Sequence, residues 1–239
     1  DGTLGGRAER PGNDLYIALG TKKYKNVTQT DKYFLANEQA QTLMHELGHN
    51  FGLSHGGYSV TSGHALADEA NWKPNYYSIM NYLYGAGLPA TLANAADRYY
   101  FEHEEENPAC AAKGVDICTM SASMCGPTAQ LGLDYSHGLG GPIDVAKVRE
   151  TAGVKQPGSA GIDFDCDGAL EAVAYAHSLY AAVDGDDEPI AVLRDHDDWA
   201  ALDLYFADRG SGFNNSGARS PADNDIQPLA APDRVPASH

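Results

Sequence analysis

The chain has 239 residues, and its 33 acidic and 16 basic side chains give a formal net charge of −17. A hydrophobic content of 43% and a charged content of 21% are typical of a globular protein, with room for one large core or two lobes. No basic stripe and no membrane-length apolar run is present, so neither nucleic acid nor a membrane is an expected partner.

The first predicted elements are a strand and a helix. Residues 13–20 (NDLYIALG) are typical of a short strand that ends at glycine. Asn37 is the predicted N-cap of the helix. Apolar residues then recur at helical spacing, which predicts one buried stripe formed by Ala40, Leu43, Met44, Leu47 and Phe51. Gly52 is expected to end the helix, because glycine readily adopts the left-handed conformation.

The remainder of the chain is expected to be more irregular. Residues 56–75 are predicted to be mostly loop, and the predicted helical segments are residues 84–95, 141–151 and 199–206. From Gly210 the composition shifts to Gly, Asn, Ser, Pro and Ala, which predicts a tail or linker over residues 210–239.

The densest group of potential metal ligands is HELGHNFGLSH, residues 45–55. His45 and His49 are four residues apart, so on a helix their imidazoles share one face and can bind a single Zn²⁺ ion. His55, brought back by the turn at Gly52, would be the third ligand, and the fourth position would stay open for water. Glu46 would act as general base on that water. Chance proximity of the histidines is the alternative, which the third histidine and the glycine disfavour.

HELGHNFGLSH followed by SIMNY (residues 78–82) resembles the metzincin clan of zinc peptidases, whose pattern is HExxHxxGxxH plus a Met-turn. The resemblance implies an α+β fold with an upper lobe of sheet and active-site helix and a loop-rich lower lobe. It implies that Met80 forms a hydrophobic floor beneath the metal and is not a ligand. Tyr82 matches a tyrosine of astacin-like and serralysin-like members that can bind the metal and stabilise the oxyanion; an ordinary core tyrosine is the alternative.

Applied to this chain, the resemblance divides it into three parts. Residues 1–52 are expected to hold the upper-lobe remnant, residues 53–209 the lower lobe with the third ligand, Met-turn, disulfides and acidic loops, and residues 210–239 the tail. Because only 44 residues precede His45, we expect an N-terminal portion or a propeptide to be missing. If residues 14–20 are the edge strand, they would bind a peptide by strand addition.

The cysteine spacing indicates disulfides and not a metal–thiolate site. The four cysteines are Cys110, Cys118, Cys125 and Cys166, and no two of them form a CxxC pair. Two disulfides in a secreted protein are expected, and of the three possible connectivities we favour Cys110–Cys118 with Cys125–Cys166. Reduced cysteines in a cytosolic enzyme are the alternative.

The acidic excess is concentrated in late loops. GIDFDCDG places Asp163, Asp165 and Asp167 at alternate positions before Gly168, as in the first half of a calcium loop. Ala174 stands where a bidentate glutamate is expected, so another ligand would be needed. The candidates for that ligand are Glu171, Asp184, Asp186, Asp195 and Asp197. A solvated acidic loop without calcium is the alternative.

The other histidines have no motif spacing and are expected to be ordinary surface or core residues: His64, His103, His137, His177, His196 and His239. The segments LGLDYSHG, GIDFDCDGALEA and VLRDHDDWAALDL resemble parts of secreted bacterial proteins of the metzincin type.

The predicted function is a secreted zinc-dependent endopeptidase that acts on protein or peptide substrates. The alternative is a zinc- and calcium-binding module without turnover, or an inert fragment of a larger peptidase. The intact Glu46 favours the endopeptidase, because loss of the base is the usual way in which such a site is silenced.

Overall fold

The computed structural model describes residues 5–19, 29–57, 71–85, 87–88, 95–103, 107–115, 132–155, 158–179 and 190–202. These residues form a mixed α+β structure in which the strands make two small antiparallel sheets, so the predicted fold class is confirmed at that level. None of the helices in these segments combines the length and the apolar character that a membrane span requires.

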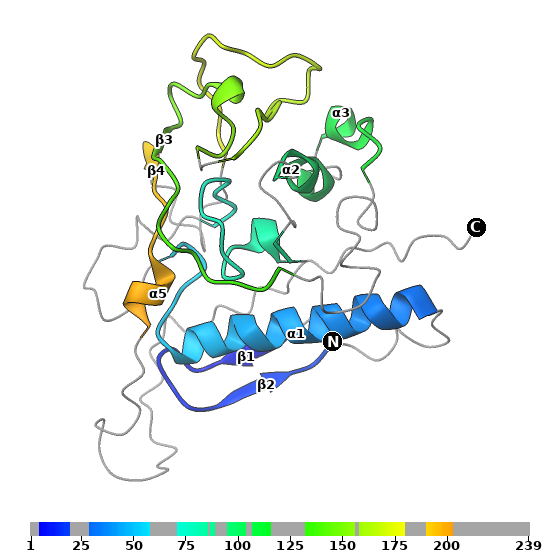
Figure 1. Ribbon diagram of the computed structural model, residues 1–239, viewed down its shortest axis with the longest axis vertical. Helices are drawn as coiled ribbons and strands as arrows, with labels where there is room; N and C mark the ends of the chain where they lie inside the picture. Colours follow the sequence, from blue (N-terminus) through cyan, green and yellow to red (C-terminus); the bar gives the residue numbers. More distant parts are fainter. Residues whose placement is uncertain are drawn as a thin grey trace.

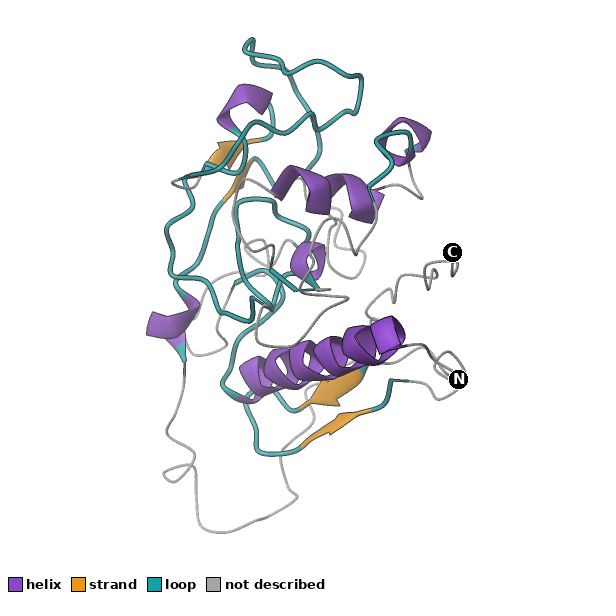
Figure 2. Ribbon diagram, turned by 45° about the vertical axis from the view of Figure 1, so that its right-hand side comes forward, coloured by secondary structure: helices purple, strands orange, loops and turns teal. Residues whose placement is uncertain are grey.

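In chain order the elements are β1 (Gly6–Ala8), β2 (Leu15–Ile17), α1 (Gln29–Asn50), the 3-10 helix η2 (Tyr82–Tyr84), α2 (Ala95–His103), α3 (Pro108–Ala111), β3 (Ile143–Asp144), the 3-10 helix η5 (Glu150–Ala152), β4 (Val192–Leu193) and α5 (Asp198–Ala201). The helix α1 lies between the β1–β2 hairpin on one side and the remaining elements on the other (Figures 1 and 2).

The β1–β2 hairpin is attached to the C-terminal end of α1. Its strands pair antiparallel with Arg7 opposite Tyr16. In the connecting loop the N–H of Gly12 donates to the carbonyl of Asn50 at 3.1 Å, and the side chain of Asn50 donates to the carbonyl of Asp14 at 3.3 Å. The strand predicted within residues 13–20 is confirmed as β2, whereas β1 is an element that the sequence pattern did not indicate.

The predicted end of α1 is confirmed and its predicted start is wrong. The helix begins at Gln29, and Asn37 is a fully buried residue in its interior and not its N-cap. At the other end Gly52 has a φ of 92°, and the N–H of Leu53 donates to the carbonyl of Gly48 at 2.9 Å. This is the left-handed glycine termination that the sequence predicted.

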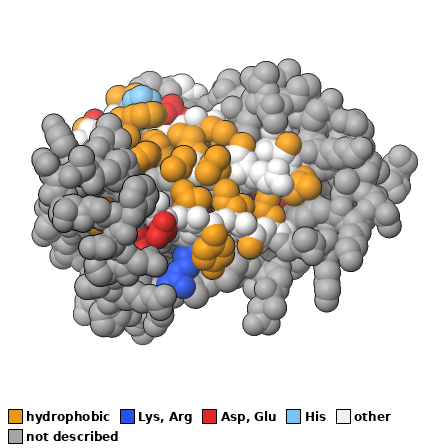
Figure 3. Space-filling view, turned by 90° about the horizontal axis from the view of Figure 1, so that it is seen from below, with side chains coloured by type: hydrophobic (Ala, Val, Ile, Leu, Met, Phe, Trp, Pro, Cys, Tyr) orange, Lys and Arg blue, Asp and Glu red, His pale blue; other side chains and the backbone are white. Residues whose placement is uncertain are grey.

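The buried face of α1 is polar, so the predicted apolar stripe is wrong. Leu43, a member of that stripe, is 44% exposed, and the other stripe residues are only partly buried. The buried positions of the helix are instead Asn37, Gln41, Thr42, His45, Glu46, Gly48, His49 and Asn50. Seen from the side on which β1 and β2 lie, hydrophobic side chains gather across the surface of the molecule (Figure 3). The helix therefore turns its polar face, with the metal-ligand motif, toward the interior.

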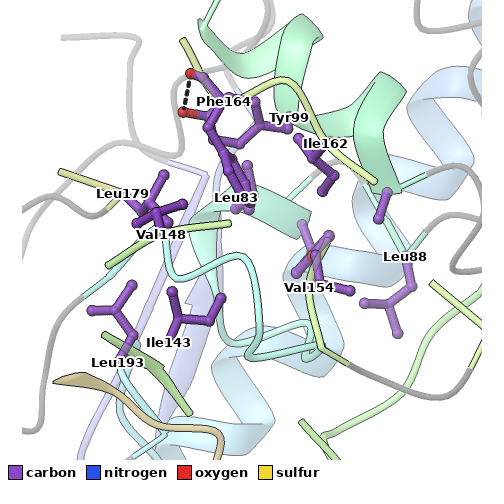
Figure 4. Packing of buried hydrophobic residues seen from close by; sticks show 12 residues of the cluster. Leu83, Leu88, Tyr99, Ile143, Val148, Val154, Ile162, Phe164, Leu179 and Leu193 are labelled. Atoms are coloured by element: carbon purple, nitrogen blue, oxygen red, sulfur yellow. Dashed lines mark hydrogen bonds between the residues drawn. The ribbon is translucent and has the colours of Figure 1, made fainter. Parts of the chain in front are cut away.

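The main hydrophobic core lies on the other side of the molecule, among the loop-rich segments (Figure 4). Its buried members are Leu83, Tyr84, Leu88, Ala95, Tyr99, Ile143, Val148, Val154, Ile162, Phe164, Leu179 and Leu193. Within it the hydroxyl of Tyr99 donates to the carbonyl of Phe164 at 3.0 Å. A second, smaller cluster consists of Leu53, Tyr76, Ile79, Met80 and Tyr135.

Two of the other helix predictions are wrong where the structure tests them. In residues 84–95 no helix runs through residues 85, 87 and 88, because Gly87 takes a φ of 100° and Leu88 pairs with Gly132. Ala95 is the first residue of α2, and residues 86 and 89–94 lie outside the described part. Residues 141–151 contain the strand β3 and the start of η5 in place of a helix. The side chain of Asp144 there accepts the N–H of Ala146 at 3.0 Å, a turn contact that competes with helix formation.

The remaining secondary-structure predictions are only partly covered by the described residues. Of the helix predicted over residues 199–206, residues 199–201 are helical as part of α5, which ends before Leu202 because Leu202 takes an extended ψ of 123°. Residues 203–206 lie outside the described part. Of the predicted loop over residues 56–75, residues 71–75 contain no helix or strand, and residues 58–70 are not described. The predicted tail also lies outside the described residues.

The predicted disulfide pairing is wrong. Cys110 in α3 is bonded to Cys166 in the acidic loop, and Cys118 and Cys125 lie outside the described residues. The side chain of Asn107, the N-cap of α3, donates to the carbonyl of Asp165 at 3.2 Å and holds the two segments together. Cys110 and Cys166 meet because two segments distant in the sequence lie together, and cysteine spacing does not reveal such an arrangement.

Truncation of the main core should show how much it contributes to stability. Phe164 is 2% exposed, and Phe164→Ala should lower the free energy of unfolding by about 3–5 kcal/mol, because the change removes a buried ring and leaves a cavity. Urea denaturation followed by circular dichroism measures the loss. Val173 is 80% exposed, and the control Val173→Ala should change stability by less than about 0.5 kcal/mol. Equal losses in both variants would contradict the core assignment.

Candidate metal centre

The three histidines of the sequence motif meet at one point. His45 and His49 project from adjacent turns of α1, and His55 follows the turn at Gly52. The Nε2 atoms are 3.1 Å apart for His45 and His49, 3.0 Å for His49 and His55, and 3.1 Å for His45 and His55. All three residues are buried. The cluster is therefore a compact triangle of ring nitrogens, called the histidine triangle below.

Backbone carbonyl groups hold two of these rings in one tautomer. The Nδ1 of His45 lies 2.9 Å from the carbonyl oxygen of Ile79, and the Nδ1 of His49 lies 2.8 Å from that of Leu53. Because a carbonyl oxygen can only accept, each Nδ1 must carry the proton. Each Nε2 then presents its lone pair to the centre of the triangle, which is the arrangement of a metal-binding imidazole.

The histidine triangle has the size that one metal ion requires. Tetrahedral zinc with nitrogen ligands at about 2.0–2.1 Å separates those nitrogens by about 3.3 Å. The observed separations of 3.0–3.1 Å are close to this value. Lone pairs directed at one another across such a distance repel, whereas a cation between them is attracted by all three. His45, His49 and His55 could therefore hold a metal ion.

Burial favours the neutral form of the three rings. It lowers the pKa of His45 to about 4, although the hydrogen bond to Ile79 acts in the opposite direction. The pKa values of His49 and His55 also lie well below the ordinary value, first because of burial and then because of the neighbouring imidazoles. The positive charge of Arg10 adds a smaller effect of the same sign. Neutral imidazole is the form that binds metals.

Glu46 follows His45 in α1 and is buried against β1. A Cβ added at Gly6 would lie only 2.6 Å from the Oε1 of Glu46, so the close approach of β1 depends on glycine. The Oε2 of Glu46 is buried, and the described residues offer it no hydrogen bond. Burial raises the pKa of this carboxyl to about 7. A buried carboxyl with an unused oxygen and a pKa near neutral can accept and return a proton.

Met80 is fully buried and packs against the ligand-bearing turn of α1. A Cβ added at Gly48 would lie 2.3 Å from the Sδ of Met80, so this contact also depends on a glycine. Tyr135 covers the same part of the helix, and its hydroxyl donates to the carbonyl of Met44 at 2.6 Å. Met80 therefore has a packing role, and its position beneath a metal ion stays a prediction of the resemblance.

Tyr82 lies beside the histidine triangle. Its ring centroid is 4.3 Å from that of His55 and 5.8 Å from that of His45. The N–H of Tyr82 donates to the side chain of Asn71 at 3.0 Å, and the ring of Trp72 meets Tyr82 edge-on at 6.3 Å. Trp72 has a φ of 62°, an unfavourable conformation for a bulky residue. The sequence pattern indicated neither Asn71 nor Trp72.

The three aspartates predicted to bind calcium also lie close together. Asp163, Asp165 and Asp167 each offer an oxygen within 4.8 Å of the others. Asp163, however, already has a cationic partner, since the Nζ of Lys113 lies 2.5 Å from its Oδ2. Burial acts to raise the pKa of Asp163, but the Lys113 ammonium and the Gly168 N–H outweigh it and lower the pKa. A calcium ion at Asp163 would therefore compete with an internal cation.

Sequence reasoning missed Glu150, which is fully buried beneath the same loop. Its Oε1 accepts the N–H of Phe164 at 2.7 Å and the hydroxyl of Tyr175, and its Oε2 accepts the N–H of Glu171 at 3.1 Å. Glu150, Asp165 and Glu171 also offer oxygens within 4.8 Å of one another. A hydrogen bond to the Glu150 carboxylate raises the pKa of Glu171 to about 7. No motif in the sequence distinguishes Glu150 from a surface glutamate.

The other candidate residues have separate roles or are not described. Asp195 accepts the hydroxyl of Ser136 at 2.7 Å, and Asp197 is the N-cap of α5. Within the described part, no possible metal-binding group includes the following histidines: His103, His137, His177 and His196. Four further candidates lie outside the described residues, namely His64, His239, Asp184 and Asp186.

No family model, curated protein sequence or solved structure matches the chain.

The contact between Gly48 and Met80 gives a test of this geometry. Alanine is normally favoured over glycine inside a helix by about 1 kcal/mol, yet Gly48→Ala should lower the free energy of unfolding by about 1–3 kcal/mol, because the new Cβ would overlap the Sδ of Met80. Met80→Ala should remove most of this penalty in a double-mutant cycle measured by chemical denaturation. Stabilisation by Gly48→Ala in both backgrounds would contradict the placement of Met80.

Proposed function

We propose that the protein is a zinc-dependent endopeptidase of the metzincin type. The observation that carries the proposal is the histidine triangle, with Nε2 separations of 3.0–3.1 Å and the buried side chain of Glu46 in the same turn of α1. Among the described residues no fourth histidine, cysteine, aspartate or glutamate belongs to this group. Three protein ligands are typical of a catalytic zinc site, whereas structural sites have four.

The residues around the triangle support hydrolysis of a peptide bond. Zinc at such a site lowers the pKa of water to about 7 and polarises a carbonyl group. Glu46 would take a proton from the attacking water at its Oε2 and return it to the leaving amine. The phenol of Tyr82 would donate a hydrogen bond to the carbonyl oxygen as negative charge develops there. The ring contacts of Tyr82 with His45 and His55 support this role.

We further propose that β1 binds the substrate in an extended conformation. The contact of Gly6 with Glu46 places β1 next to the general base. One edge of β1 pairs with β2, and no other described strand pairs with its second edge. A peptide could add to that edge through backbone hydrogen bonds. The sequence-based expectation is that the peptide adds to residues 14–20, and β2 also has a second edge that no other described strand pairs with; the contact of β1 with Glu46 favours β1.

The two-lobed arrangement and secretion are parts of the same proposal. In it α1 and the β1–β2 hairpin belong to the upper lobe, and the segments from His55 onward belong to the lower lobe. The position of α1 between the hairpin and the loop-rich part supports this division (Figure 2). The Cys110–Cys166 disulfide supports export, because such bonds persist in oxidising compartments.

We also propose calcium as a second, structural ion at the acidic loop. The clustering of Asp163, Asp165 and Asp167 supports it, and Glu150 with Glu171 adds two carboxyl groups next to Asp165. Carboxylate oxygens are the ligands that Ca²⁺ prefers. Because Lys113 already pairs with Asp163, the ion would either displace Lys113 or use the oxygens of Asp165, Glu150 and Glu171.

The role of Glu46 can be tested separately from metal binding. Glu46→Gln should retain about one zinc ion per chain, measured by elemental analysis. It should lower kcat/KM on a quenched fluorescent peptide library by about 10²–10⁴-fold, because the amide cannot accept the proton. Glu38→Gln, in the same helix, is the matched control and should retain activity. Full activity of Glu46→Gln would remove the base assignment. A zinc-loaded wild-type protein that cleaves no peptide would favour the binding-module alternative.

Calcium binding should appear as a shift of the melting temperature. Millimolar Ca²⁺ should raise the Tm of the zinc-loaded protein relative to a calcium-selective chelator, because an ion that binds only the folded state stabilises it. Asp165→Asn should abolish this shift, since Asp165 belongs to both candidate ligand groups. Differential scanning calorimetry measures both effects, and a Tm that is the same with calcium and with chelator would rule out the site.

A further inference from the structure

We propose that Asp198, in α5, is a positioning residue for the histidine triangle. In this inference Asp198 fixes the turn that contains Ile79 and Met80, and the carbonyl of Ile79 in turn fixes the ring of His45. The inference rests on the proposed zinc site and deepens it, because it assigns control of metal affinity to a residue that does not touch the metal ligands.

Asp198 is fully buried and accepts hydrogen bonds from four groups. Its Oδ2 accepts the hydroxyl of Ser78 at 2.6 Å and the N–H of Ser136 at 3.0 Å. The hydroxyl of Tyr76 lies 2.9 Å and 2.8 Å from the two carboxylate oxygens, and the Nδ1 of His196 lies 3.0 Å from Oδ1. A buried carboxylate with this many donors fixes the position of each of them, and its loss would leave them unsatisfied.

Ser78 connects this carboxylate to the metal ligand. Its hydroxyl donates to Asp198, and its hydroxyl oxygen accepts the N–H of Met80 at 3.1 Å. The peptide groups between Ser78 and Met80 include the carbonyl of Ile79, which accepts the Nδ1 proton of His45 at 2.9 Å. A continuous series of bonds therefore joins Asp198 to the ring whose Nε2 belongs to the triangle.

The segment around Asp198 also contacts the loop that carries His55. The ammonium of the buried Lys73 donates to the carbonyl of Gly56 and, at 2.7 Å, to the carbonyl of Arg194. A Cβ added at Gly57 would lie 2.5 Å from the Cβ of His196, so His196 packs directly on this loop. Residues 194–198 thus contact both the turn that holds His45 and the loop that follows His55.

The positioning role of Asp198 should be measurable as a change in metal affinity. A metal ion requires its donor atoms in a fixed geometry, and loss of the outer partners that orient a ligand typically costs 10–100-fold in affinity. General destabilisation of the protein has no such selective effect on the affinity of the folded state. The chain supplies a control in Tyr99, which is also buried and donates its hydroxyl to the carbonyl of Phe164 at 3.0 Å, but in the main core.

The experiment compares Asp198→Asn, Ser78→Ala and Tyr99→Phe in the full chain. Zinc dissociation constants are measured in the folded proteins by competition with a chromophoric chelator, and the visible spectra of the Co²⁺ forms report ligand geometry. Asp198→Asn and Ser78→Ala should raise the dissociation constant by about 10–100-fold and alter the Co²⁺ spectrum. Tyr99→Phe, which removes a buried hydroxyl from the main core, should lower stability and leave both readouts at their wild-type values.

The outcomes separate this inference from the proposed function. Wild-type zinc affinity in both Asp198→Asn and Ser78→Ala would overturn the positioning role and leave the zinc site intact. If Asp198→Asn does not fold, Ser78→Ala decides alone, because it removes only one hydroxyl from the connection. Equal weakening by Tyr99→Phe would also overturn the inference. A wild-type protein that binds no zinc would overturn the proposed function and this inference with it.

Discussion

The arrangement of three imidazole lone pairs around one point is the constraint on which the structure depends. Because lone pairs on Nε2 atoms 3.0–3.1 Å apart repel one another, the rings must be fixed by contacts on their opposite, Nδ1 side. The carbonyl groups of Ile79 and Leu53 hold His45 and His49 through their Nδ1 protons. Leu53 follows Gly52, which ends α1 in the left-handed conformation, and its N–H donates to the carbonyl of Gly48. The end of the helix therefore also fixes the orientation of the His49 ring.

The same constraint explains why α1 buries polar residues. A helix that turns His45, Glu46 and His49 inward cannot also turn an apolar stripe inward, and much of its stability must come from hydrogen bonds and glycine-permitted contacts. The contact of Gly48 with Met80 and that of Gly6 with Glu46 are two examples. Elsewhere the described part has few regular elements, and buried carboxylates organise its loops. Glu150 does so beneath the acidic loop, and Asp198 at the turn that holds His45.

The features that the sequence predicted correctly depend on residues close together in the chain. The four-residue spacing of His45 and His49 and the termination at Gly52 depend on neighbours along the chain, and the structure brings these residues together as expected. The burial of α1 was predicted wrongly because periodicity identifies a stripe but not the side that faces the interior. Asp198 accepts a hydrogen bond from Ser78 at a sequence separation of 120, and no local sequence pattern predicts such a contact. The Cys110–Cys166 bond, at a separation of 56, was missed for the same reason. Zinc and peptide hydrolysis remain predictions from the motif and from the geometry that supports it.

X-ray absorption at the zinc edge of the metal-loaded protein tests the central claim most directly, because it reports the atoms bound to the metal. The account predicts three imidazole nitrogens at about 2.0–2.1 Å together with one oxygen from solvent, and no sulfur. A sulfur scatterer at about 2.3 Å, a fourth protein ligand in place of solvent, or fewer than three imidazoles would contradict it.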